Sequence, residues 1–234
     1  GPVAALFAIM TKVGAYAIIR VYTIIFPPEL EATIGLHGQW LLPLALASLA
    51  IGMIGVLAAR QLNRLVAFSV IGSMGMVMVA ISLFTPAGIA AALYYIVHST
   101  LAAAALFLIS DLVRSTRANL ELTAQPPVVS APMTAGLFFV AAIAITGLPP
   151  MSGCIGKLLV LDAAFEAPNA AWVWGIVLVS SLISIVGFAR AGSVVFWQAQ
   201  SIQHPLDAQA TQKPSALSYA AVGSLVAVLV IYTV

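Results

Sequence analysis

Long apolar stretches follow one another along the sequence, and they restrict its fold more than any other feature. Most of them reach the roughly 20 residues that a helix needs to cross the hydrocarbon core of a bilayer. Because lipid offers backbone amides no hydrogen-bond partner, such stretches predict membrane-spanning helices, and the alternation typical of barrel strands is missing. We therefore expect an all-α integral membrane protein with about eight transmembrane helices. The stretches fall at 3–26, 40–59, 65–84, 87–109, 128–147, 150–166, 171–192 and 216–234.

The composition excludes several classes of protein. Of the 234 residues, 62% are hydrophobic and 7% are charged, whereas a soluble domain carries roughly a quarter charged residues. A water-soluble globule is thereby excluded. The net charge of +2 comes without a basic run interleaved with aromatic residues, which argues against nucleic-acid binding. The single cysteine, Cys154, has no metal-ligand spacing around it, and we expect neither a metal nor a cofactor.

The connections between the stretches indicate domain organisation and orientation. We expect residues 1–234 to form one membrane domain, and an opening on Gly1-Pro2 instead of Met is typical of a piece of a longer chain. Arginines follow the second and fourth stretches and glutamates follow the first, so the positive-inside rule places the arginines in the cytoplasm. Eight separate crossings would put Arg190 and Lys213 on the opposite side. The residues that set this orientation are Arg60, Arg64, Arg114, Arg117, Glu29 and Glu31.

A run of glycines and prolines interrupts the apolar sequence near 147–153. Two prolines and two glycines cannot continue a regular helix, so this run predicts a broken helix. Non-helical backbone at membrane depth is stable only where protein buries it or where it lines a wet cavity, and such breaks in transporters mark ion or substrate paths. A tight turn between the fifth and sixth stretches is the alternative interpretation. The residues of the predicted break are Gly147, Pro149, Pro150 and Gly153.

Three basic side chains, Lys12, His98 and Lys157, lie inside apolar stretches and far from either interface. A lysine at the centre of a spanning helix costs ~2.5–3.5 kcal/mol, which favours a functional role. Snorkelling beside the broken helix is the alternative for Lys157. Histidine titrates near neutral pH, which suits a proton relay between lysines. A neutral imidazole also often bonds a hydroxyl across helices, and Tyr94 and Tyr95 are at hand for that role.

Two motifs of soluble enzymes are incomplete in this sequence. Lys157 ends a glycine-containing run similar to a phosphate-binding loop, but Leu158 stands where that loop needs Ser or Thr. Ser152 lacks the Gly-x-Ser-Gly loop of an intramembrane serine protease. The glycine pairs of the second and third stretches are typical of close packing between helices. These glycines are Gly52, Gly55, Gly72 and Gly75.

Four segments together resemble the antiporter-like subunits that respiratory complex I shares with multisubunit Mrp-type sodium/proton antiporters. The resemblance implies that Lys12 is the family's central lysine, His98 its mid-membrane histidine, and Lys157 the lysine after its second broken helix. It also implies that this chain is similar to the last eight helices of a longer fold, with 65–192 as the second of two inverted five-helix repeats. The segments are 10–16 (MTKVGAY), 64–69 (RLVAFS), 96–99 (IVHS) with the small residues after it, and 147–158 (GLPPMSGCIGKL).

Two departures point to one branch of this family. Asn63 and Phe68 stand where the proton-pumping subunits of complex I usually carry lysine and tyrosine, so the chain looks most like the D-type subunits of Mrp antiporters. The resemblance then implies a multi-pass protein of the bacterial inner membrane that moves protons along Lys12, His98 and Lys157. Its partners would be other antiporter subunits, Na⁺ or K⁺, and the lipid bilayer. The glutamate that pairs with the central lysine in the family has no counterpart in this sequence.

Two other interpretations stay open. The first is a membrane subunit of NADH:quinone oxidoreductase or of a related hydrogenase. Any NADH dehydrogenase activity would then belong to the whole complex, because these residues form no recognisable quinone, flavin or NADH site. The second is a non-conducting structural scaffold, whose buried charges would only hydrogen-bond between helices.

Overall fold

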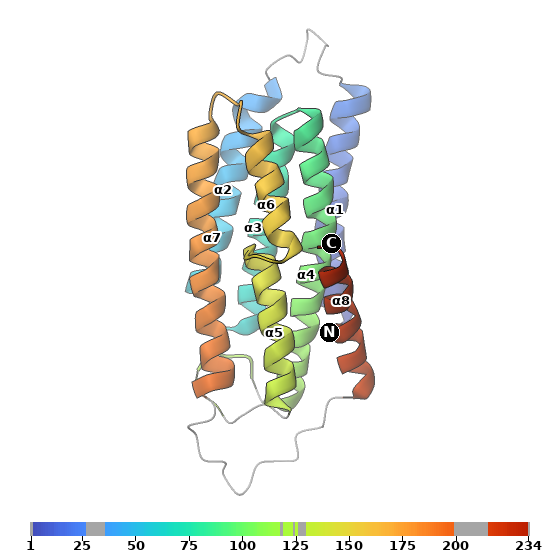
Figure 1. Ribbon diagram of the computed structural model, residues 1–234, viewed down its shortest axis with the longest axis vertical. Coiled ribbons are helices and arrows are strands. Elements are labelled where there is room, and N and C mark those ends of the chain that lie inside the picture. The colour runs from blue at the N-terminus through green and yellow to red at the C-terminus, as the bar shows by residue number, and fades with distance from the viewer. Residues whose placement is uncertain are drawn as a thin grey trace, which may run out of the picture.

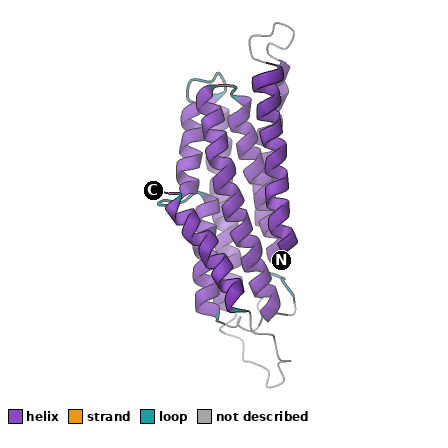
Figure 2. Ribbon diagram, turned by 90° about the vertical axis from the view of Figure 1, so that its right-hand side faces the viewer, coloured by secondary structure: helices purple, strands orange, loops and turns teal. Residues whose placement is uncertain are grey.

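A computed structural model of the chain shows a bundle of α-helices (Figures 1 and 2). It describes residues 2–26, 36–117, 119–123, 125, 130–198 and 215–233, with the side chains of 2–8 and 36–39 left aside. Glu29, Glu31 and Lys213 lie outside these residues. Within the described part of the chain, β-structure is limited to an isolated bridge between Gln61 and Glu121. The expected all-α fold is confirmed.

The helices run largely along one long axis, as the two perpendicular views show. Helix α4 is central, because α1, α3, α5, α6 and α8 all pack against it, while α2 packs against α3 and α7. Two short π-helical segments, η1 and η2, extend α1 and α7. The elements are α1 (Pro2–Arg20), η1 (Val21–Ile25), α2 (Leu36–Ala58), α3 (Leu62–Ser82), α4 (Pro86–Thr116), α5 (Ala131–Thr146), α6 (Ser152–Ala163), α7 (Ala170–Gly192), η2 (Ser193–Trp197) and α8 (Ala216–Ile231).

Four helical segments of the described chain, in α2, α3, α4 and α7–η2, are long and apolar enough to cross a membrane. Helices α5 and α8 are apolar but have 16 residues each, and α6 has 12. The C-terminal end of α8 lies at about half the height of the bundle in both views. The apolar stretches of the sequence therefore differ in how far they reach along the bundle.

Helices α5 and α6 are stacked end to end and do not form a hairpin. In Figure 1, α5 occupies the lower part and α6 the upper part of one column, and both pack against α4. The link between them contains Pro149 and Pro150. Helix α5 ends at Gly147, which has a φ of 77°, a left-handed conformation that favours glycine. The stretches at 128–147 and 150–166 thus form one interrupted column, which differs from the expectation that each crosses the membrane by itself.

This stacking brings Arg190 to the same end of the bundle as the arginines that follow α2 and α4. Arg117, just after α4, donates from Nη2 to the carbonyl oxygen of Val195 in η2 at 2.6 Å. Arg190, near the end of α7, donates from Nη2 to the carbonyl oxygen of Ala59, just after α2, at 2.7 Å. The expectation that Arg190 lies opposite the other arginines is therefore wrong, because α5 and α6 together make one passage along the bundle.

Glycines allow α2 and α3 to approach each other closely. A Cβ atom at Gly52 would overlap the backbone of Gly72, and one at Gly55 would overlap the ring of Phe68. A Cβ atom at Gly75 would lie 2.7 Å from Cα of Leu49. Since real Cβ atoms do not approach so closely, positions 52 and 75 accept only glycine without movement of a helix, and a side chain at position 55 would have to displace the Phe68 ring. The expected role of these glycines in helix packing is confirmed.

We expect Gly52→Ala to lower the thermal midpoint of the full-length protein by several degrees, because the added methyl group must push α2 away from α3. The measurement is the loss of folded protein with temperature, followed by size-exclusion chromatography in detergent. Gly136→Ala on α5 is the matched control, since no atom lies within 4 Å of its Cβ position. Alanine is also favoured over glycine in a helix by about 1 kcal/mol. Equal midpoints for the two variants would contradict the close packing.

Candidate functional site

The three basic residues singled out in the sequence lie on three helices, of which α4 contacts both of the others. Lys12 is on α1, His98 on α4 and Lys157 on α6, and both α1 and α6 pack against α4. The exposed fractions of the three side chains are 4%, 0% and 7%. His98 lies within electrostatic range of both lysines, with the stronger influence from Lys157. The fold therefore brings these groups into one buried, basic cluster.

Lys157 reaches back from α6 to the end of α5. Its Nζ donates to the carbonyl oxygen of Thr146 and, at 2.8 Å, to Oγ of Ser181 on α7. The amine passes directly beside Gly147, where a Cβ atom would lie 2.7 Å from Cδ of Lys157. A cation at the C-terminal end of a helix is favoured by the helix dipole. Lys157 is thus enclosed by protein and stabilises the end of α5.

The remaining carbonyl groups at the end of α5 are partly satisfied by its own turn. The Gly147 N–H donates to the carbonyl oxygen of Ala144 at 3.2 Å, and the Leu148 N–H donates to that of Ile143 at 3.1 Å. This pair of bonds is a Schellman motif, which ends many helices at a left-handed glycine. The Thr146 carbonyl lies outside that motif and is the one that receives the Lys157 amine.

Lys12 faces the bundle from the middle of α1. Its Nζ donates to Oγ of Ser73 on α3 at 3.1 Å. Tyr16, one turn further along α1, is 50% exposed, so the lysine is turned inward where the tyrosine is not. A groove of about 470 Å³ between α1 and α4 reaches Lys12 and is otherwise lined mainly by apolar side chains.

His98 is completely buried against α6. Its Nδ1 lies 2.9 Å from Oγ of Ser152, the first residue of α6. Its Nε2 makes no hydrogen bond among the described residues. Tyr95 packs its ring on the imidazole at a centroid distance of 5.4 Å. Tyr94 instead stacks on Tyr232 of the C-terminal segment. A hydroxyl group across helices thus bonds His98, as the alternative interpretation has it, but it is that of Ser152 and not that of Tyr94 or Tyr95.

Two glycines on α6 allow this close contact with α4. Gly153 lies in the first turn of α6 and not in the link, which differs from its expected place in the break. A Cβ atom there would overlap the Ala144 carbonyl oxygen and lie 2.9 Å from Nε2 of His98. A Cβ atom at Gly156 would lie 2.7 Å from the Tyr95 ring. These glycines bring the start of α6, and Ser152 with it, onto the histidine.

Each basic residue has a serine partner on a neighbouring helix. Sequence reasoning considered Ser152 only for a protease site and did not single out Ser73 or Ser181. Ser73 and Ser181 use their own hydroxyl protons to bond carbonyl oxygens of their own helices, Val70 and Val177. Their oxygen atoms are thereby left as acceptors for the lysine amines. The described residues contain no group of three or more metal-binding side chains. Among the described residues, the printed hydrogen-bond partners of the three basic groups are thus neutral hydroxyl and carbonyl oxygen atoms.

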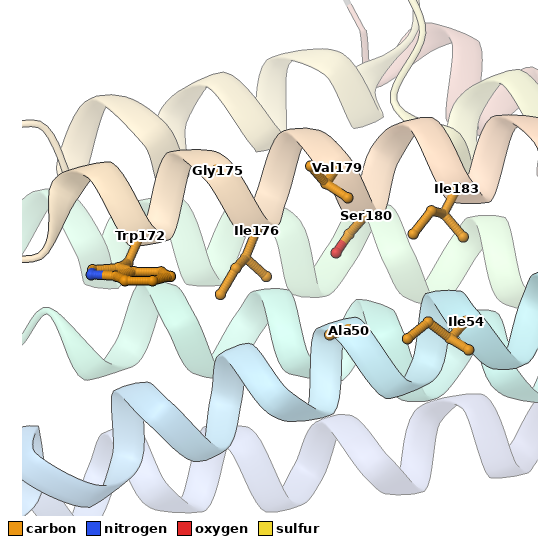
Figure 3. Close-up of a pocket in the computed structure, with 8 residues that line it drawn as sticks. All are labelled: Ala50, Ile54, Trp172, Gly175, Ile176, Val179, Ser180 and Ile183. Carbon is orange, nitrogen blue, oxygen red and sulfur yellow. The ribbon is translucent and has the colours of Figure 1, made fainter.

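The lateral groove between α2 and α7 is separate from this cluster (Figure 3). It encloses about 300 Å³, and none of the three basic residues lines it. Figure 3 shows apolar side chains from both helices and the Ser180 hydroxyl directed into the groove. Its lining residues are Ala50, Ile54, Trp172, Gly175, Ile176, Val179, Ser180 and Ile183. The groove therefore belongs to the outer surface of the bundle.

Known proteins share both the sequence pattern and the fold of this chain. Residues 1–184 match the family described as NADH:quinone oxidoreductase/Mrp antiporter, transmembrane. The D subunit of the Na(+)/H(+) antiporter of Bacillus subtilis is 32% identical over 197 residues, which cover 83% of this chain and 39% of that protein. The D subunit of a probable K(+)/H(+) antiporter of Rhizobium meliloti is 33% identical over 228 residues, which cover 84% of this chain and 42% of that protein.

A solved structure shares the fold. In the structure of the Mrp complex from Dietzia sp. DQ12-45-1b, one chain superposes with a TM-score of 0.77 at 22% identity, covering 95% of this chain and 48% of that one. The chain spans less than half the length of these relatives.

Proposed function

This chain belongs to the NADH:quinone oxidoreductase/Mrp antiporter transmembrane family, and we propose that it is the C-terminal part of a proton-translocating antiporter subunit. The subunit exchanges Na⁺ or K⁺ for protons together with other subunits in the bacterial inner membrane. The observation that carries this proposal is the cluster of Lys12, His98 and Lys157, all buried and all bonded to neutral oxygen atoms. The antiporter names of its relatives support the substrate class.

The chemistry follows from charge in a buried site. An uncompensated amine charge away from water is unstable, and a neighbouring charge strongly changes its proton affinity. A proton that arrives at one basic group therefore promotes release from the next. Lys12, His98 and Lys157 stand on three adjoining helices, so protons pass between them through hydroxyl groups and water in hydrated gaps.

The proposed topology follows from the interrupted column. Helices α5 and α6 cross the membrane together, so five crossings extend from α2 to α7. This unit is the proposed second inverted five-helix repeat, in place of the range 65–192 that separate crossings implied. All described helices form one membrane domain. The end that carries Arg60, Arg64, Arg117 and Arg190 faces the cytoplasm under the positive-inside rule.

Single cysteines test this topology in the full-length protein with Cys154 replaced by alanine. Asn63, in the first turn of α3, and Glu166, just after α6, are both exposed. Figure 1 shows the start of α3 and the end of α6 at opposite ends of the bundle. We expect Asn63→Cys to react with a membrane-impermeant maleimide only from the cytoplasm, and Glu166→Cys only from outside. Labelling of both from the same side would contradict a single crossing by α5 and α6.

Removal of either lysine tests the proton path. In the intact complex in inverted vesicles, we expect Lys12→Ala and Lys157→Ala to abolish cation-dependent proton flux while assembly persists. A smaller loss is expected for His98→Ala, because water can replace one imidazole in a proton relay. Loss of a lysine removes both a proton carrier and the positive charge that changes the proton affinity of its neighbours. Full flux in an assembled Lys12→Ala variant would discard the mechanism.

A structural scaffold is the second candidate, and one observation favours it: Lys157 is already satisfied by hydrogen bonds at the end of α5. Lys157→Arg separates the two functions, because arginine keeps the charge but stays protonated at any workable pH. We expect Lys157→Arg and Lys157→Ala to lose antiport equally across pH, at normal subunit levels. An arginine variant as active as the parent would remove Lys157 from the path and leave the scaffold.

A further inference from the structure

Ser152 joins three parts of the molecule at the interruption. It is completely buried, and its Oγ lies 2.9 Å from Nδ1 of His98 on α4. Its backbone N–H donates to Oγ1 of Thr233 at 2.9 Å, just after α8. The same Oγ lies 3.5 Å from the carbonyl oxygen of Leu229 in the last turn of α8. This one hydroxyl therefore contacts both a titratable ring and the end of a distant helix.

The end of α8 is held firmly in this position. Tyr94 on α4 donates its hydroxyl to the carbonyl oxygen of Tyr232 at 3.3 Å, and Tyr232 donates to that of Tyr94 at 3.4 Å. Their rings stack at a centroid distance of 4.8 Å. Tyr94 lies one helical turn before His98. The reciprocal pair therefore fixes the Leu229 carbonyl group beside Ser152.

We propose that Ser152 is a positioning residue that lets His98 gain and lose a proton without losing its hydrogen bond at Nδ1. The Leu229 carbonyl group of α8 is the alternative acceptor that makes this exchange possible. This inference rests on the proposed function and extends it, since it makes the end of α8 a part of the proton site.

The exchange needs only rotation of one O–H bond. When the imidazole is neutral with its proton on Nε2, the Ser152 hydroxyl donates to Nδ1. When a proton binds to Nδ1, the ring N–H donates to Ser152 Oγ, and the hydroxyl proton turns to the Leu229 carbonyl oxygen. That carbonyl lies at the C-terminal end of α8, where the helix dipole favours a nearby cation. Both charge states of His98 thus keep a partner at Nδ1.

The charges around His98 make the hydrogen bond between its Nδ1 and Ser152 important. Lys157 on α6 and Lys12 on α1 are the basic side chains within electrostatic range of His98, and like charges nearby disfavour a positive charge on an imidazole ring. The titratable side chains nearest on α4 are Tyr94 and Tyr95. Helix α5 has no titratable side chain, and the hydroxyl of Tyr219 on α8 bonds Thr134 on α5. An imidazolium there is therefore stabilised chiefly by protein oxygen atoms, Ser152 Oγ at Nδ1 and the Ala144 carbonyl oxygen near the other side of the ring.

The test measures the protonation of His98 directly in the assembled complex. The full-length subunit is labelled with ¹⁵N-histidine, its imidazole resonances are followed by solid-state NMR against pH, and His98→Gln assigns the signal. In Ser152→Ala, the Nδ1–H of the protonated ring loses its acceptor, so we expect a several-fold smaller protonated fraction at a given pH. Ser152→Thr, which keeps the hydroxyl, is expected to restore it.

Ser184→Ala is the matched control, because Ser184 is equally buried but its hydroxyl bonds only Ser181 of its own helix. Thr233→Val is a second variant, which frees the first N–H of α6 and is expected to lower the protonated fraction less. An unchanged fraction in Ser152→Ala or, if that variant fails to assemble, in Thr233→Val would overturn the proposal. The readout requires no transport, so its outcome stands apart from the lysine flux test.

Discussion

Backbone carbonyl groups at a helix end inside an apolar bundle need hydrogen-bond donors from the protein itself, and the interruption after α5 creates such groups. A Schellman turn at Gly147 satisfies two of them, and the Lys157 amine satisfies that of Thr146. The carbonyl end of α5 and the Ser181 hydroxyl in turn favour the buried lysine amine. The broken helix and the buried charge therefore stabilise each other.

The same interruption organises the surrounding helices. Because α6 continues in the direction of α5, its first turn lies against α4 at His98, and the end of α8 reaches the same level. The glycines at 153 and 156 make this contact possible, since a side chain at either position would strike α4 or the end of α5. Because α5 and α6 together run only once along the bundle, α7 ends at the same end of the bundle as α2. There Arg190 donates to the carbonyl oxygen of Ala59 just after α2.

The burial of the basic residues follows from the sequence, because the cost of a charge in lipid is large enough to require an inward position. The direction of the chain after the break does not follow from the sequence, because a hairpin of two helices and an end-to-end stack of them bury the same apolar residues. The position of Arg190 in the sequence already indicated the answer, because only an end-to-end stack of α5 and α6 places Arg190 at the same end as Arg60 and Arg64. The serine partners were hidden for another reason. Ser73 and Ser181 resemble any serine in an apolar helix until their neighbours are known.

The hydrogen bonds of Lys157 explain how one residue can serve both structure and proton transfer. A protonated lysine amine has three N–H donors, and a neutral one has two donors and a lone pair. Two donors go to Thr146 and Ser181, both of which accept in either state. Loss of the third proton therefore leaves both bonds in place and exposes a lone pair where that proton was. In the proposed proton path the end of α5 would therefore stay capped in both charge states of Lys157, and the fold would not have to open for a proton to move.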